Sequence, residues 1–400
     1  MKNSNERLGD LGWSLYRNEV GIHTFELQYE FNFKIEYAML QRIWNELICK
    51  NPRCSNNKHT VSIMRGLRIQ ILNIDAGQIL KIIVNPSLMV DGEGGYLGIT
   101  DRHSNILARC KRSFDAYWKK NGFESIRMNR CSLTRVDLCM NIAFSGNFTV
   151  ANYIDLLKHT PHNARMSLYA MPDSEQDQHV FDIFNQSRGL MVYDKRYEQQ
   201  RYGNSLFDCE HLMRIEYRLR ARAIGKLRGQ KNLIGNLNLL GWILDHSPEL
   251  LCEGVHSCLF GEPYFSAEKI RAQIKSRKEW RPETKDRMWR MQQELYHAKT
   301  FDSYIAPFHT IEEWKEFPMA EIDVYQQRRK QMGNLLQRYK ELGISPVALP
   351  KRCGILCLPS LPQLVCAMLY NRMCNACQTC KLEYTPTFPM HSFNSCQTRL

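Results

Sequence analysis

Hydrophobic and polar residues alternate along three stretches of this chain. In residues 23–37, apolar side chains stand at every second position from Phe25 to Tyr37, with polar side chains between them. A similar two-residue period recurs over 131–144 and 211–221. Alternation of this kind places apolar residues on one face of a strand and polar residues on the other. The pattern therefore predicts three half-buried strands.

Helical spacing and shorter strands occupy the segments between them. Apolar residues at three- and four-residue steps predict helices at 38–50, 102–120 and 150–159, the last capped by Thr149. Further strands are expected at 60–72, 79–84, 164–170, 178–184 and 189–195. The order strand–helix–strand–strand thus occurs twice. This order predicts an α+β fold with two similar halves of antiparallel sheet, each with helices on one face.

Composition changes along the chain and suggests four parts. We expect an N-terminal α+β DNA-binding half at 1–122 and a catalytic α+β half at 123–225. Basic residues at helical spacing predict an α-helical C-terminal domain at 226–346. The segment 347–400 is rich in cysteine, and we expect a poorly ordered tail without an assigned function. Within it, Cys374, Cys377 and Cys380 with Cys353 or Cys357 give a weak zinc-ligand pattern.

The charge balance favours a polyanionic partner. The 400 residues include 54 Lys and Arg against 41 Asp and Glu, a formal net charge of +13. The first residues lack the apolar core of a signal peptide, and no apolar run reaches membrane-spanning length. We therefore expect a cytoplasmic protein without a membrane partner, whose cysteines are reduced.

Polar residues of three expected strands suggest a reactive site. Tyr193 and Lys195 share one face of the strand at 189–195, and Asp137 and Glu216 lie on the polar faces of their own strands. If these strands are neighbours in one sheet, the four side chains share one open surface. A tyrosine hydroxyl can attack phosphorus, a cation can hold the phosphate, and hard carboxylates suit Mg²⁺ or Mn²⁺.

These motifs resemble one known family, the gene II-type replication proteins of filamentous phages, which are relatives of plasmid rolling-circle initiators. The matching motifs are Arg135-Val136-Asp137, Ser187-Arg188, Tyr193-x-Lys195-x-x-Glu198 and Arg214-x-Glu216. The resemblance covers about residues 60–345 and is densest over 130–222.

The resemblance implies a site- and strand-specific endonuclease. Such an enzyme nicks a replication origin through a tyrosine, stays linked to the DNA 5′ end and later rejoins the strand. It also implies two kinds of partner in a bacterial host cell. One is the origin DNA, single- and double-stranded, and the other is host replication proteins such as a helicase. We expect catalysis by Tyr193 and Lys195, and metal binding by Asp137, Glu216 and Glu198. The expected DNA contacts are Arg135, Ser187, Arg188, Arg214, Arg218 and Arg220.

Several assignments stay open at the level of sequence. Tyr197 shares a face with Tyr193 in an extended strand, so it is a second candidate nucleophile. The paired histidines with which many rolling-circle nucleases hold their metal are absent. Asp137 and Glu216 have an alternative role as ion-pair partners of nearby arginines. A non-catalytic origin- or operator-binding protein, or a plasmid-type initiator or relaxase, is the alternative function.

Overall fold

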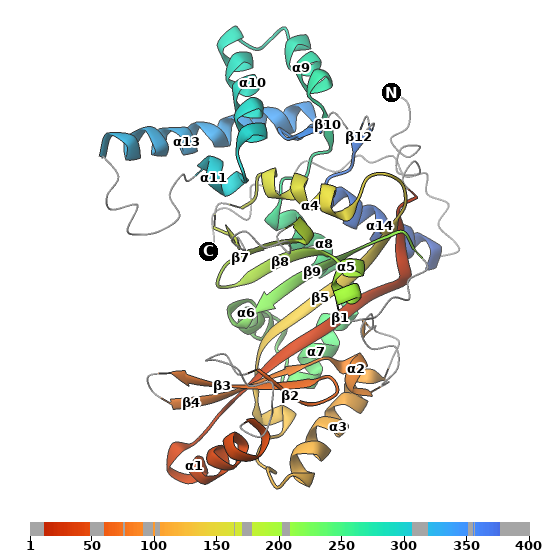
Figure 1. Ribbon diagram of the computed structural model, residues 1–400, viewed down its shortest axis with the longest axis vertical. Coiled ribbons are helices and arrows are strands. Elements are labelled where there is room, and N and C mark those ends of the chain that lie inside the picture. Colours follow the sequence, from red (N-terminus) through yellow and green to blue (C-terminus); the bar gives the residue numbers. More distant parts are fainter. Residues whose placement is uncertain are drawn as a thin grey trace.

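One long antiparallel sheet organises the molecule (Figure 1). The computed structural model describes residues 12–48, 60–74, 77–90, 99–100, 105–163, 165–169, 178–201, 209–305, 319–350, 355 and 357–376. Nine strands form the sheet in the order β2 (Val61–Met64), β3 (Leu67–Ile74), β4 (Gly77–Val84), β1 (Ser14–Glu30), β5 (Ser132–Phe144), β9 (His211–Arg220), β8 (Arg188–Asp194), β7 (Val180–Phe184) and β6 (Ser167–Leu168). Each neighbouring pair is antiparallel.

The two expected halves of the fold are continuous with each other. The strands β2, β3, β4 and β1 form the first half, and β5 to β9 form the second. Pairing of β1 with β5 joins them, with Phe25 opposite Val136 and Glu26 opposite Arg135. Three register shifts interrupt this pairing, each of which locally bends and twists the two strands. The predicted α+β class with antiparallel halves is confirmed.

The first helix begins earlier than the alternation indicated. The strand expected over 23–37 ends at Glu30, and α1 (Phe33–Arg42) begins at once, followed by a π-helical turn at Ile43–Ile48. Glu36 explains the change. Its carboxylate accepts the backbone N–H of Asn32 at 2.9 Å and the Tyr29 hydroxyl at 2.6 Å. These bonds satisfy a free donor at the start of the helix and outweigh the two-residue pattern.

Helices cover the apolar face of the sheet. They are α3 (Ile106–Lys120), α4 (Val150–His159), α7 (Asn236–Asp245) and α8 (Ser247–Cys258), and all contribute to the main hydrophobic core. Helix α4 begins with a capping box in which Thr149 and Asn152 bind each other's backbone N–H groups. Further helical segments in this part of the chain include α2 (Pro86–Val90), the 3₁₀ turn Met128–Arg130, and α6 (Ala221–Lys231).

The helical region has a hydrophobic core of its own. It contains α9 (Ala267–Ser276), α10 (Pro282–His297), α11 (Phe301–Ile305) and α13 (Met319–Leu342). This core begins at Phe260. Buried residues of α6, α7 and α8 belong to the core of the sheet instead. The separately packed helical region is therefore shorter than the expected 226–346.

Part of the cysteine-rich segment belongs to the folded core. The strands β11 (Ala348–Leu349) and β12 (Cys357–Leu358) pair with β10 (Tyr264–Ser266) in a small second sheet. Helix α14 (Leu361–Ala376) then packs against α8, burying Leu364, Val365 and Leu369. The expected poorly ordered tail is thus wrong for 357–369. The sequence carried a signal for this role, because Leu361, Leu364, Val365, Met368 and Leu369 follow helical spacing, but two prolines in the apolar stretch obscured it.

A disulfide joins Cys252 of α8 to Cys366 of α14. This bond contradicts the expectation that every cysteine is reduced. Of the expected zinc-ligand pattern, Cys353, Cys377 and Cys380 lie outside the described residues. Among the helices that are described, none is long and apolar enough to cross a membrane.

We predict that Gly254→Ala destabilises the protein by about 1–3 kcal/mol, because overpacking forces side chains from their rotamers. A Cβ atom at Gly254 would lie 2.5–2.6 Å from ring atoms of the buried Tyr217. The matched control is Gly241→Ala in α7, where nothing lies within 4 Å of the added Cβ. The control should be neutral or stabilising by up to about 1 kcal/mol. Urea unfolding measures both, and equal stabilities would contradict the packing of α8 on β9.

Candidate active site

Strand register brings the expected reactive residues to the polar face of the sheet. Asp137 of β5 lies opposite Arg218 of β9, and Cys139 lies opposite Glu216. Across the next pair, Glu216 lies opposite Met191 and Arg214 lies opposite Tyr193 of β8. Because directly opposed residues point to the same side of a sheet, these side chains form one polar layer.

Tyr193 and Glu216 interact directly. The tyrosine hydroxyl donates a hydrogen bond of 2.9 Å to Oε1 of Glu216, and Nε2 of His23 lies 3.9 Å from the same oxygen. Burial and the neighbouring Glu216 charge raise the pKa of Tyr193 well above its ordinary value. The phenol is therefore held protonated, with a carboxylate placed to accept its proton.

Lys195 lies at the start of helix α5 (Lys195–Arg201) and not in the strand. The helix begins here because the Asp194 carboxylate accepts the backbone N–H of Tyr197 at 3.0 Å. Lys195 pairs with Glu198 one turn later, and its Nζ lies 5.7 Å from the centre of the Tyr193 ring. Burial lowers the pKa of Lys195 to about 8, and Arg214 adds to this effect.

Asp137 belongs to a chain of ion pairs that crosses the junction between the halves. Its Oδ2 accepts hydrogen bonds from the Thr24 hydroxyl and from Arg135, the latter at 2.9 Å. Arg135 also contacts Glu26 at 3.4 Å, and Glu26 binds Lys81 of β4 at 2.8 Å. Opposite charges therefore alternate from β4 through β1 to β5.

The arginines of β9 extend this charged layer. Arg214 is fully buried, and its Nε donates to Oδ1 of Asn141 at 2.7 Å. Arg218 binds both oxygens of Asp182 on β7, at 3.2 and 2.9 Å. Arg220 donates to the backbone oxygen of Asn185.

Three buried donors in this layer have no acceptor among the described residues. They are Nε of Arg135, Nε of Arg218 and Nδ2 of Asn141. Oδ1 of Asp137 is a buried acceptor for which the described residues supply no donor. An unpaired buried polar group costs about 1–3 kcal/mol, so native structures rarely retain one without a ligand or a water. The layer therefore has free hydrogen-bonding capacity, mostly for an anion.

The expected metal ligands do not converge. Asp137 binds Thr24 and Arg135, Glu216 binds Tyr193, and Glu198 binds Lys195. Within the described residues, the three carboxylates do not form a group whose oxygens lie within 4.8 Å of one another. This arrangement does not fit a three-carboxylate Mg²⁺ or Mn²⁺ site, although the free Oδ1 of Asp137 is a potential oxygen ligand.

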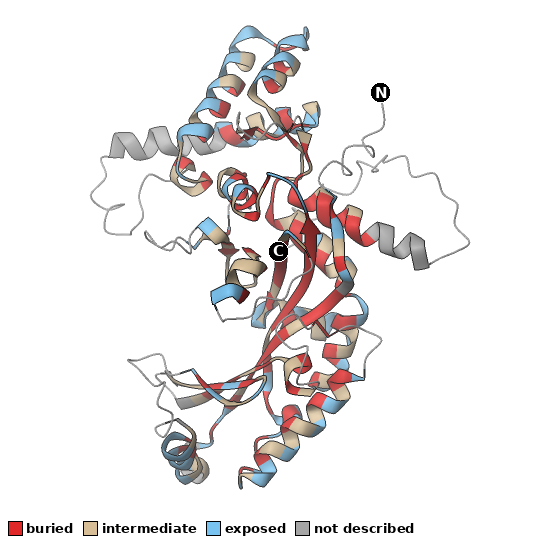
Figure 2. Ribbon diagram, turned by 45° about the vertical axis from the view of Figure 1, so that its right-hand side comes forward, coloured by how far each residue is buried: buried red, intermediate tan, exposed pale blue. Residues whose placement is uncertain are grey.

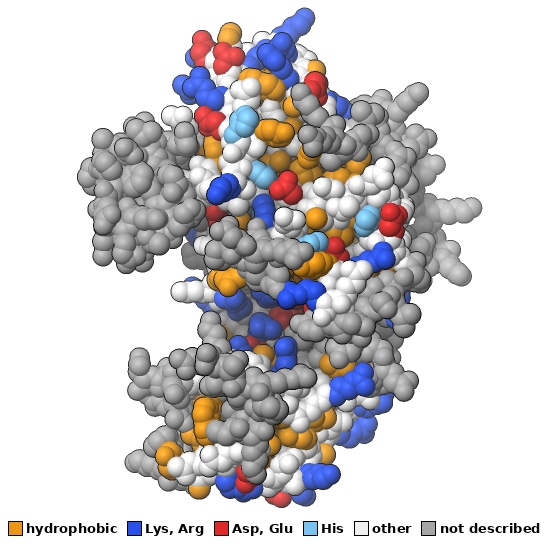
Figure 3. Space-filling view, in the orientation of Figure 1, with side chains coloured by type: hydrophobic (Ala, Val, Ile, Leu, Met, Phe, Trp, Pro, Cys, Tyr) orange, Lys and Arg blue, Asp and Glu red, His pale blue; other side chains and the backbone are white. Residues whose placement is uncertain are grey.

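The polar layer is also less open than the sequence indicated. The exposed fractions are 2% for Asp137, 6% for Tyr193, 2% for Lys195 and 4% for Glu216. Figure 2 shows the central strands buried along most of their length. Charged side chains nevertheless gather in a hollow at the waist of the molecule, at the level where β1 and β5 connect the halves (Figure 3).

Three of the expected site residues lie apart from this layer. Arg188 points to the helix-covered face, where it donates to the Ser257 hydroxyl of α8 at 2.8 Å. Ser187 lies in the turn between β7 and β8, and its backbone oxygen accepts the N–H of Arg220. Tyr197 lies in α5, stacked on His179 with 3.6 Å between ring centres.

Several members of the layer were not among the site residues expected from the sequence. These are His23, Thr24, Glu26, Lys81, Asn141 and Asp182. Glu26 and Asn141 could have been predicted from the sequence, because both stand at the alternate positions that form the polar face of their strands. His23 had none, because it lies at a register shift between Ile22 and Thr24.

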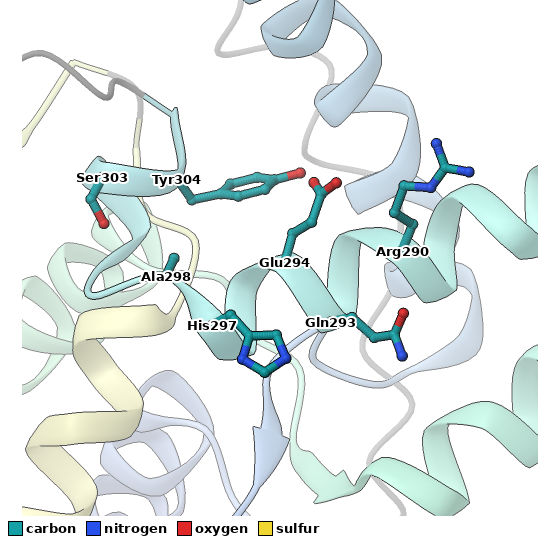
Figure 4. A pocket seen from close by; sticks show the side chains of 7 residues that line it. All are labelled: Arg290, Gln293, Glu294, His297, Ala298, Ser303 and Tyr304. Atoms are coloured by element: carbon teal, nitrogen blue, oxygen red, sulfur yellow. The ribbon is translucent and has the colours of Figure 1, made fainter.

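A separate pocket of about 430 Å³ lies in the helical region between α10 and α11 (Figure 4). Its lining includes Arg290, Glu294 and His297 of α10 and Tyr304 of α11. None of the expected site residues contributes to this pocket.

Comparison with known proteins adds no assignment to this geometry. No protein-family model matches the chain, and no curated protein sequence matches it.

Lys195 leads to a prediction on the pH dependence of stability. In the folded protein the pKa of Lys195 is about 8, whereas in the unfolded chain it has its ordinary pKa of 10.5. Between these values the unfolded state binds more protons, so the wild type gains stability with rising pH. The gain relative to Lys195→Met should reach up to about 3 kcal/mol, at 1.4 kcal/mol per pKa unit.

Urea unfolding of both proteins at pH 7.5, 9 and 10.5 measures this gain. Comparison with the variant cancels groups that titrate equally in both proteins. A stability difference that does not change with pH would contradict the buried position of Lys195.

Proposed function

We propose that this protein is a rolling-circle replication initiator that nicks and rejoins one DNA strand through Tyr193. The observation that carries the proposal is the Tyr193–Glu216 hydrogen bond inside a layer that has unpaired donors. The bond pairs a nucleophile with a base. The free donors of Arg135, Arg218 and Asn141 suit a phosphodiester, because guanidinium groups bind phosphate oxygens well.

The chemical step follows from these contacts. Glu216 takes the proton of Tyr193 as the phenolic oxygen forms a bond to phosphorus. The bond between phosphorus and the 3′ oxygen breaks, and Lys195, with a pKa lowered to about 8, supplies the proton that this oxygen takes up. The products are a free 3′-hydroxyl and a 5′-phosphotyrosine. Rejoining is the same step in reverse and needs no ATP.

The burial of the layer imposes a condition on this reaction. At an exposed fraction of 6%, the Tyr193 ring and hydroxyl have little contact with solvent. A DNA strand must therefore open the layer before a phosphate reaches the hydroxyl. Exchange of an internal ion pair such as Arg218–Asp182 for an arginine–phosphate pair is one route, because it replaces one charge-assisted contact by another.

The first test is covalent trapping on origin DNA, carried on a supercoiled plasmid or on single strands. We predict that the wild type forms a protein–DNA 5′ adduct, whereas Tyr193→Phe forms none, because the ring remains but its nucleophilic oxygen is lost. Denaturing gels detect the nick and the adduct. Parallel reactions with Mg²⁺, with Mn²⁺ and with chelator test the expected cofactor.

Tyr197→Phe is the matched control, because it lies four residues away and outside the layer. The control should keep the adduct. If Tyr197→Phe loses it and Tyr193→Phe keeps it, Tyr197 is the nucleophile. If wild-type protein binds the origin without nicking, the non-catalytic DNA-binding function replaces the proposal.

A second test uses the two faces of the sheet. Arg220→Ala on the charged side should weaken DNA binding and reduce the slope of log K against log salt by about 1, as the loss of one phosphate contact does. Arg188→Ala, on the helix-covered side, should leave that slope unchanged. Melting temperatures confirm that both variants fold. Equal slopes for the two variants would contradict DNA binding by the charged layer.

A further inference from the structure

Two cysteines and a histidine meet where α8 and α14 pack together. Cys252 and His256 lie four residues apart on α8, so both point to the same side of the helix. Cys366 of α14 lies opposite them. One sulfur or nitrogen atom of each residue lies within 4.8 Å of the other two. No other group of three potential ligands meets this criterion within the described residues.

The surroundings hold these three residues in place. Ser360, just before α14, donates a hydrogen bond to the backbone oxygen of Gly261, just after α8. Leu364, Val365 and other buried side chains of α14 join the core of the sheet. The ends of the two helices are therefore fixed independently of the cysteines, which makes the site pre-organised.

The His256 ring is available to a ligand. It is half-buried, and no described residue hydrogen-bonds it. The backbone of Gly261 packs beside the ring, because a Cβ added there would be in van der Waals contact with it, 3.7 Å from Nδ1. A half-buried imidazole beside two sulfur atoms is a common ligand arrangement for zinc.

We propose that Cys252, His256 and Cys366, when reduced, bind a zinc-class divalent ion, with water in the fourth position. Two thiolates and one imidazole select Zn²⁺ over the hard ions Mg²⁺ and Mn²⁺. Metal–sulfur bonds of about 2.3 Å at tetrahedral angles separate the two sulfurs by about 3.8 Å, so their bond must first be broken. This site is distinct from the charged layer and does not depend on the proposed function.

The disulfide and the metal are alternative states of the same residues. A dithiol reductant gives two electrons and two protons to the disulfide and becomes a cyclic disulfide itself. Cys252 and Cys366 are then thiols, and metal binding releases their two protons. Either state joins α14 to α8, which packs directly on β9 through Gly254 and Tyr217. The cysteine-rich segment thus stays attached to the sheet in both redox conditions.

Cobalt binding to the full chain tests the proposal. Because other tail cysteines can bind metal, the background carries Ser at Cys353, Cys357, Cys374, Cys377, Cys380 and Cys396. Under anaerobic reduction, we predict that one equivalent of Co²⁺ produces visible absorption typical of tetrahedral thiolate ligation, and that Zn²⁺ abolishes it. The oxidised protein should not produce it.

Variants separate this site from other ligands. Cys252→Ser and Cys366→Ser should lose the absorption, and His256→Asn should bind at least 10-fold more weakly while keeping both cysteines. The controls are Cys258→Ser, at a buried free cysteine on α8, and His246→Asn, at the residue just before α8. Both variants should bind Co²⁺ as the background does.

Two outcomes overturn the proposal. One is Co²⁺ absorption that is equal in the His256→Asn variant and in its background. The other is a disulfide that resists excess dithiol in the folded protein, measured by the mass of the alkylated chain, because the ligands would then never become available. Melting temperatures of each variant show whether a loss of binding reflects unfolding.

Discussion

The pairing of β1 with β5 is the contact on which the rest of the structure depends. It joins two antiparallel halves into one sheet and aligns Thr24 and Glu26 with Asp137 and Arg135. On one side of this junction the apolar residues of both halves share a hydrophobic core. On the other side, charges from β4, β1 and β5 form a single line of ion pairs. Without this pairing the charged residues would belong to two unconnected surfaces.

Burial gives the charged layer its chemical character. An ion pair that is removed from water loses solvation, and its stability depends on complete hydrogen bonding. Here the pairing is extensive but incomplete, because Arg135, Arg218, Asn141 and Asp137 each keep one atom without a partner in the described part of the chain. The same burial that raises the pKa of Tyr193 lowers that of Lys195. These opposite shifts give one group that holds its proton and one that releases it near neutral pH, which is a useful pair for acid–base chemistry.

The segment after the helical region, which contains β11, β12 and α14, belongs to the folded structure. Two short strands and α14 return from the helical region to the sheet, where α14 packs on α8. The disulfide between Cys252 and Cys366 links α14 to α8 covalently. The helical region is therefore connected to the main sheet at both ends, through α8 before it and through α14 after it.

The sequence by itself located most strands of the sheet and the face of most polar side chains, although the single strand expected at 60–72 is the hairpin of β2 and β3. Asp137, Tyr193 and Glu216 share a face because side-chain direction in a strand has a period of two. The same parity puts Arg188 with Leu190 and Val192 on the opposite face, which the structure shows through its bond to Ser257. The family resemblance had instead implied that Arg188 contacts DNA.

Only the tertiary structure decided which strands are neighbours, how deeply the charges are buried and which carboxylates meet. Register and burial depend on contacts between residues far apart in the chain, and no local pattern contains them. At two positions, local hydrogen bonds start a helix where the alternation of apolar and polar residues predicted a strand. Glu36 starts α1 early, and Asp194 turns Lys195 and Tyr197 into α5. The meeting of Cys252, His256 and Cys366 likewise depends on the packing of α14 against α8, because 114 residues separate the two cysteines.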